Sequence, residues 1–74
     1  MKINDFELLI ANSSDLEYLT CEIYYKDEMI AEISQEYENS TVTIYPPLSE
    51  KSWTIPTDEF IEVLKAAKLH LYEK

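Results

Sequence analysis

The chain has 74 residues with 15 acidic side chains, six lysines and no arginine, which gives a formal net charge of −9. A folded surface with this charge attracts cations and basic proteins and repels phosphate backbones, which argues against direct nucleic-acid binding. Apolar residues make up 46% of the chain, more than in a disordered acidic tail, and the length suits one domain.

Several classes of protein are excluded by what the sequence lacks. It contains no glycine, so it carries no phosphate-binding loop and no dinucleotide fingerprint. Its longest apolar stretch, Leu8–Ala11, is far shorter than the roughly 20 residues of a membrane-spanning helix, so we expect no membrane association. The N-terminus has no apolar h-region, so we expect no signal peptide and a cytoplasmic protein.

Four segments are predicted to be β-strands because apolar and polar residues alternate along them. Short polar stretches separate the segments, and Lys26-Asp27-Glu28 is a plausible hairpin connection. The predicted strands are Phe6–Ala11, Leu19–Lys26, Met29–Tyr37 and Thr41–Tyr45.

The alternation predicts which side chains share a face of the sheet. The inward set is Phe6, Leu8, Ile10, Leu19, Cys21, Ile23, Tyr25, Met29, Ala31, Ile33, Val42 and Ile44. Cys21, the only cysteine, is interpreted as a small core residue that cannot form an internal disulfide. The outward set is Glu22, Tyr24, Ile30, Glu32, Glu36, Thr43 and Tyr45, with Trp53 expected at its rim.

One amphipathic helix is predicted over Asp58–Tyr72, with Thr57 as its N-cap and two acids in its first turn. Together these elements predict an α+β fold in a single domain of residues 1–74. In this fold a four-stranded antiparallel β-meander (ββββα) carries one C-terminal amphipathic helix packed on one face. One helix covers only one face, so the other face meets solvent or a partner.

We find no catalytic constellation and predict no enzyme, no cofactor and no metal site. The lone histidine, His70, has no cysteine or histidine nearby in the sequence that would complete a zinc site. Adjacent acids such as Asp58 and Glu59 point in different directions, and the serines have no nearby base. We therefore predict that the protein binds a partner and does not catalyse a reaction.

The candidate binding site is the predicted outer face, where carboxylates alternate with tyrosines. Carboxylates attract lysine and arginine, and aromatic rings stack on guanidinium groups and supply buried area. The same residues would also suit an ordinary solvated sheet face or a homodimer contact. The predicted partner-binding residues are Glu22, Tyr24, Glu32, Glu36, Tyr45 and Trp53.

Three segments and one tryptophan resemble a pattern in small acidic immunity proteins of bacterial contact-dependent inhibition and related polymorphic toxin systems. They are Thr20–Tyr25, Ala31–Glu36 and Thr43–Pro46, followed by Trp53 ahead of the helix. The resemblance implies a cognate partner, a basic toxin such as a nuclease, whose active-site cleft the protein blocks. The carboxylates would stand in for the phosphates of nucleic acid.

The order of a short sheet followed by a helix also resembles HicB-type antitoxins, as does the start of the helix from Thr57 to Ile61 and on to Ala67. The chain departs from that family in lacking glycine at its bends and room for an appended DNA-binding module. The acidic surface is equally compatible with a nucleic-acid mimic that binds many DNA-binding proteins, and with a small homodimeric acidic domain of housekeeping role.

Overall fold

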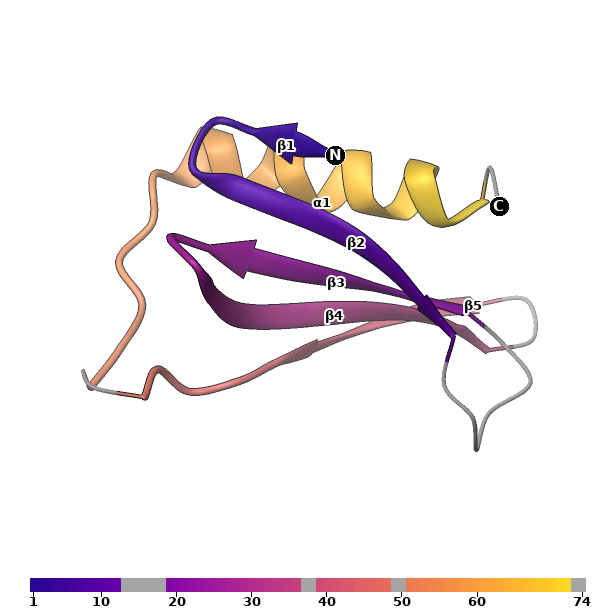
Figure 1. The fold of residues 1–74 in the computed structure, drawn as a ribbon, viewed down its shortest axis with the longest axis horizontal. Helices are drawn as coiled ribbons and strands as arrows, with labels where there is room; N and C mark the ends of the chain where they lie inside the picture. Colours follow the sequence, from indigo (N-terminus) through magenta and orange to yellow (C-terminus); the bar gives the residue numbers. More distant parts are fainter. Residues whose placement is uncertain (13–18, 37–38, 49–50, 73–74) are drawn as a thin grey trace.

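The computed structural model of the chain describes residues 1–12, 19–36, 39–48 and 51–72. It has the predicted α+β architecture, an antiparallel sheet with one C-terminal helix lying across it (Figure 1). The strands follow one another in the sheet in chain order, so every pair joins sequence neighbours. The elements are β1 Lys2–Ile3, β2 Phe6–Asn12, β3 Leu19–Tyr25, β4 Glu28–Glu36, β5 Asn39–Ile44 and α1 Thr57–Tyr72.

Within the described ranges the sheet has five strands, where the sequence predicted four. The additional strand, β1, pairs with the start of β2 through Lys2 opposite Glu7 and Ile3 opposite Phe6. Two residues are too short for alternation to identify a strand, and the turn that follows contains Asn4 in the left-handed region, with φ 54°.

Most predicted element boundaries lie within two residues of the observed ones. β3 ends at Tyr25, and Lys26 belongs to the turn. β5 begins at Asn39 and ends at Ile44, where Thr41–Tyr45 was predicted. The predicted strand end at Tyr37 lies outside the described residues.

The core lies between the sheet and α1. Phe6, Leu8 and Ile23 point into it as the alternation predicted, and Cys21 is fully buried as a free thiol, which confirms its interpretation as a core residue. From the helix, Val63, Ala67 and Leu71 recur at intervals of four, which places them on one face of α1. The remaining buried apolar residues are Ile30, Ala31 and Ile33.

A β-bulge in β4 overturns part of the predicted alternation. Ile23 lies opposite Ala31, but the next residue, Tyr24, lies opposite Met29, so Ile30 is the extra residue of β4. Ile30 is only 1% exposed and belongs to the core, although it was predicted on the outward face. Met29, predicted inward, lies opposite Tyr24 on the outward side instead.

The helix covers only part of the sheet. Its contacts are mainly with β3, followed by β2 and β4. Val42 and Ile44 of β5 lie opposite Ile33 and Ala31, on the predicted inward side. They are nevertheless 46% and 59% exposed, because α1 packs mainly on β2, β3 and β4.

The predicted hairpin connection after β3 is observed, and it is made without glycine. Lys26 and Asp27 both have positive φ, 50° and 70°, which is the backbone that a tight two-residue hairpin turn requires. The Lys26 amide donates to the carbonyl of Asp5 at 3.1 Å, which ties this turn to the β1–β2 turn. Lysine has no local side-chain advantage in the left-handed region, so this position is strained.

We therefore expect Lys26→Gly to be more stable than Lys26→Ala by about 1 kcal/mol, because only glycine adopts this φ without a Cβ clash. Both variants lose the ammonium group that lies 5.3 Å from the Tyr25 ring centroid, so the alanine variant is the matched control. Urea unfolding followed by circular dichroism measures the difference. Equal stability of the two variants would show that the turn stores no backbone strain.

Candidate partner-binding face

The face of the sheet opposite α1 is here called the outer face. Because the strands pair in register, its side chains form rows that cross the sheet. The central row runs from Leu9 through Glu22 and Glu32 to Thr43, one residue from each of β2 to β5. Two carboxylates thus occupy adjacent positions at the middle of the outer face.

Glu22 and Glu32 lie directly opposite each other on neighbouring strands. Like charges in this arrangement repel and destabilise a sheet. Among the described residues, the one ion pair within 4 Å joins the Met1 amino group to Glu7, at 3.6 Å. None of the lysines in the described ranges therefore forms an ion pair with Glu22 or Glu32.

Two tyrosines in the neighbouring row, nearer the β3–β4 turn, donate hydrogen bonds to the carboxylates. The Tyr24 hydroxyl donates to Glu22 Oε1 at 3.0 Å, and the Tyr45 hydroxyl donates to Glu32 Oε1 at 2.5 Å. Bonds to a carboxylate are stronger than neutral ones, so they orient both acids and both rings. We call Glu22, Tyr24, Glu32 and Tyr45 the Tyr–Glu cluster.

The hydrogen bonds also alter the acidity of the phenols. The bond to Glu22 raises the pKa of Tyr24, and the bond to Glu32 raises the pKa of Tyr45, with smaller contributions from desolvation and carboxylate charge. The cause is that a phenolate would lose its donated proton and face a carboxylate of the same sign. Both rings therefore stay neutral donors across the physiological range.

The structure places the six predicted site residues in three ways. Four of them form the Tyr–Glu cluster. Glu36 is the last residue of β4, where its backbone lies opposite Asn39 of β5.

Trp53 lies elsewhere, on the core side of the sheet rather than at the outer rim. Its ring packs edge-on against Tyr25, with centroids 6.4 Å apart, and it contacts the core cluster. Its Nε1 donates to the carbonyl of Tyr45 at 2.7 Å. Trp53 thus holds the segment after β5 against the sheet, which positions the backbone of Tyr45.

The outer face also contains two apolar residues that were not named as site residues. Leu9 is 45% exposed beside Glu22, and Met29 lies opposite Tyr24. The alternation of Phe6, Leu8 and Ile10 already implies that Leu9 faces outward. Nothing in the sequence indicates the bulge that turns Met29 outward.

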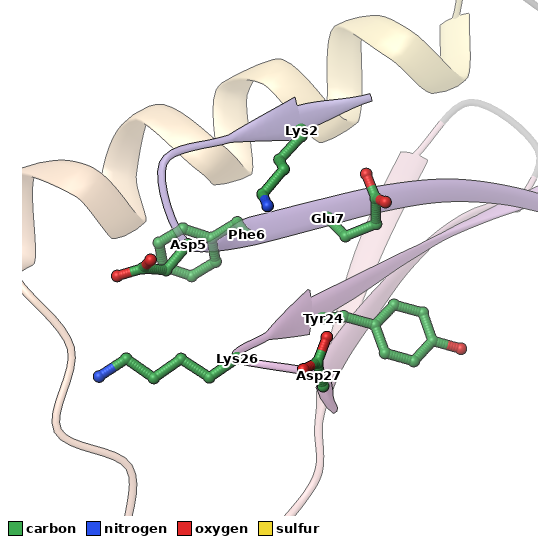
Figure 2. Close-up of a pocket in the computed structure, with 7 residues that line it drawn as sticks. All are labelled: Lys2, Asp5, Phe6, Glu7, Tyr24, Lys26 and Asp27. Atoms are coloured by element: carbon green, nitrogen blue, oxygen red, sulfur yellow. The ribbon is translucent and has the colours of Figure 1, made fainter.

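A shallow hollow of about 290 Å³ adjoins the cluster at the turn end of the sheet. Figure 2 shows Lys2 over β2 and Lys26 extending away from the hairpin turn. Asp5, Glu7 and Asp27 also line it, so the hollow contains charges of both signs. The hollow extends the polar surface beside Tyr24.

Comparisons with known proteins do not assign the chain to a family. No protein family, curated protein or solved structure matches the chain. Within the described ranges, no group of three or more His, Cys, Asp or Glu side chains is placed to hold a metal ion. No helix in that part of the chain is long and apolar enough to cross a membrane.

Tyrosine titration tests the hydrogen bonds of the cluster. We expect Tyr24 and Tyr45 to titrate above the ordinary value of about 10, and Glu32→Ala to lower the pKa of Tyr45 toward it. Because the folded-state pKa is raised, the stabilisation is complete below pH 10 and is lost as the pH rises through that pKa. NMR of ¹³C-labelled tyrosine resolves each ring, and Glu62→Ala on α1 is the control. An unchanged Tyr45 midpoint in Glu32→Ala would contradict the bond.

The opposed carboxylates give a stability prediction. We expect Glu22→Gln to raise the free energy of unfolding by about 0.2 to 1 kcal/mol, because it removes like-charge repulsion and keeps an acceptor for Tyr24. The gain should shrink as salt increases. Glu62→Gln, on the exposed side of α1, removes the same charge and should have a smaller effect. Equal gains for both variants would mean that only net charge matters.

Proposed function

We propose that the chain is a non-catalytic binding protein whose outer face binds a basic protein. In the favoured form of this proposal it is an immunity protein that neutralises a cognate toxin, such as a nuclease, by occluding its active site. The observation that supports it is the Tyr–Glu cluster, in which Glu22 and Glu32 lie opposite each other without a described cation within 4 Å. Opposite charges in such a row stabilise a sheet, whereas like charges directly opposite each other destabilise it.

A cationic side chain from a partner would relieve the repulsion within the cluster. A guanidinium group presents several donors in one plane and bridges carboxylates well. Tyr24 and Tyr45 both lie in the row next to the acids, toward the β3–β4 turn, and their rings offer faces on which that guanidinium stacks. Because each ring is already oriented by its hydrogen bond, little side-chain freedom is lost on binding.

The charge of the whole chain acts in the same direction. Enzymes that cleave nucleic acid line their clefts with cations that hold phosphates. A surface of net charge −9 is steered toward such a cleft, and steering raises association rates by 10-fold or more at low salt. The paired carboxylates then occupy the positions of phosphates.

The second candidate is a nucleic-acid mimic or HicB-like antitoxin that uses the same face. A mimic reads only the charge spacing of its partners, so it binds many DNA-binding proteins weakly and releases them as salt rises. A dedicated inhibitor adds a desolvated aromatic and apolar contact, here from Tyr24, Tyr45 and Leu9, and so retains one partner at moderate salt.

The first experiment is affinity capture from a lysate of the source organism, in low and then in moderate salt. A single basic protein retained at moderate salt supports a dedicated inhibitor. A spread of DNA-binding proteins that washes off favours the mimic. No retained protein, together with a dimeric mass, leaves an acidic self-associating domain.

Charge reversal then tests the face itself. We expect Glu22→Lys and Glu32→Lys each to weaken binding of the captured protein by at least about 10-fold, with slower association, because a like charge meets the partner's cations. Glu62→Lys changes the net charge equally from α1 and should change the affinity by less than about 2-fold. Calorimetry and biolayer interferometry measure both. Equal effects of all three variants would contradict the proposal that the outer face binds the partner.

A further inference from the structure

In the part of the chain that the structure describes, β5 forms one edge of the sheet, and no strand pairs with its outer side. β5 pairs with β4 on one side, and it is the last strand in the sheet order. Its apolar residues Val42 and Ile44 are 46% and 59% exposed on the α1 side, because the helix packs mainly on β2, β3 and β4. In Figure 1, α1 lies toward the β1–β2 edge of the sheet, away from β5.

The sequence of this edge lacks the usual protection. Natural sheets guard their edge strands with charged residues, proline, bulges or short length, because an exposed ladder recruits another strand. The opposite edge, β1, has only two residues. β5 has six residues, Asn-Ser-Thr-Val-Thr-Ile, with no charge and no proline, in a chain whose net charge is −9. It is therefore the part of the sheet at which two copies can meet without direct charge repulsion.

The hydrogen bonds of β5 determine which residues are available at the free edge. The Tyr45 amide, directly after the strand, donates to the carbonyl of Ile30 at 2.8 Å. Antiparallel ladders alternate between residues that bond to a neighbour and residues that bond to the other side. Thr43 and Thr41 thus direct their backbone groups toward β4, whereas Val42 and Ile44 direct theirs toward the free edge.

Within β5, Val42 lies between two threonines, Thr41 and Thr43. In a two-fold antiparallel pair centred on Val42, this residue faces its own copy and Thr41 faces Thr43 of the second copy. Thr–Thr and β-branched pairs are favourable cross-strand contacts. We propose that β5 pairs with β5 of a second copy, with Val42 on the two-fold axis.

This pairing does not rest on the proposed function. A two-fold axis that joins antiparallel edge strands runs perpendicular to the sheet, so both α1 helices lie on one side. Both Tyr–Glu clusters then lie on the other side of one continuous sheet and stay accessible. The apolar side chains of Val42 from the two copies cover each other in the space beside the helices.

The test is the mass in solution, by sedimentation equilibrium in about 0.15 M salt, where surface charges are screened beyond about 8 Å. We expect the mass to change from 8.7 kDa to twice that value as the concentration rises from about 1 to 200 µM. Val42→Pro removes an N–H that no β4 residue uses, so the fold should remain while the dimer dissociates. Circular dichroism verifies the fold.

A matched pair of lysine variants identifies the interface even if the proline variant fails to fold. Val42→Lys places like charges opposite each other at the axis and should weaken dimerisation by at least about 10-fold. Leu9→Lys adds the same charge at a residue of similar exposure, 45%, on the outer face and should leave the dimer intact. A monomer at about 200 µM, a dimer that survives Val42→Lys, or a dimer lost in Leu9→Lys would each overturn the proposal.

Discussion

The width of a single helix is the constraint on which the rest of this structure depends. An α-helix with its side chains is about 10–12 Å across, and neighbouring strands lie about 4.8 Å apart, so one helix covers roughly three strands. Here those strands are β2, β3 and β4, and the core forms where Phe6, Ile23 and Val63 meet. The outer face and the β5 edge are both left uncovered by this geometry. The chain therefore has more sheet than its helix can bury.

Alternation in the sequence predicts most of this sheet because each strand buries one face only. Phe6 and Leu8 in β2 and Cys21 and Ile23 in β3 point inward as expected. The prediction fails at Ile30, because a bulge inserts a residue without leaving a local mark in the sequence. Ile30 and Met29 are both apolar, so either one satisfies the pattern, and only the pairing with β3 decides between them.

The candidate site was predictable to the extent that it lies within regular strands. Glu22, Tyr24 and Glu32 follow from the period of two, and their proximity follows from the pairing of consecutive strands. The position of the Trp53 side chain could not be predicted in this way. Trp53 lies in the segment between β5 and α1, where no alternation of residues indicates which way a side chain points. Its indole needs a hydrogen-bond acceptor and an apolar surface, and the Tyr45 carbonyl and the Tyr25 ring supply both.

The two central carboxylates, which have no ion-pair partner among the described residues, lower the stability of the fold. Glu22 and Glu32 repel each other, and each gains only a phenol as a donor. Lysines are present in the chain, but Lys65 and Lys68 lie on α1, on the other side of the sheet. Lys2 and Lys26 lie nearer, at the hollow beside Tyr24, but no lysine in the described ranges forms an ion pair within 4 Å with Glu22 or Glu32.

The position of α1 after all five strands has a consequence for the biosynthesis of the protein. Strands that pair with sequence neighbours form early, since few residues separate their contacts. At a synthesis rate of about 5–20 residues per second, the ribosome needs roughly 1 to 6 s to pass from the end of β5 to the end of α1. During that interval the apolar side of the nascent sheet has no helix to cover it.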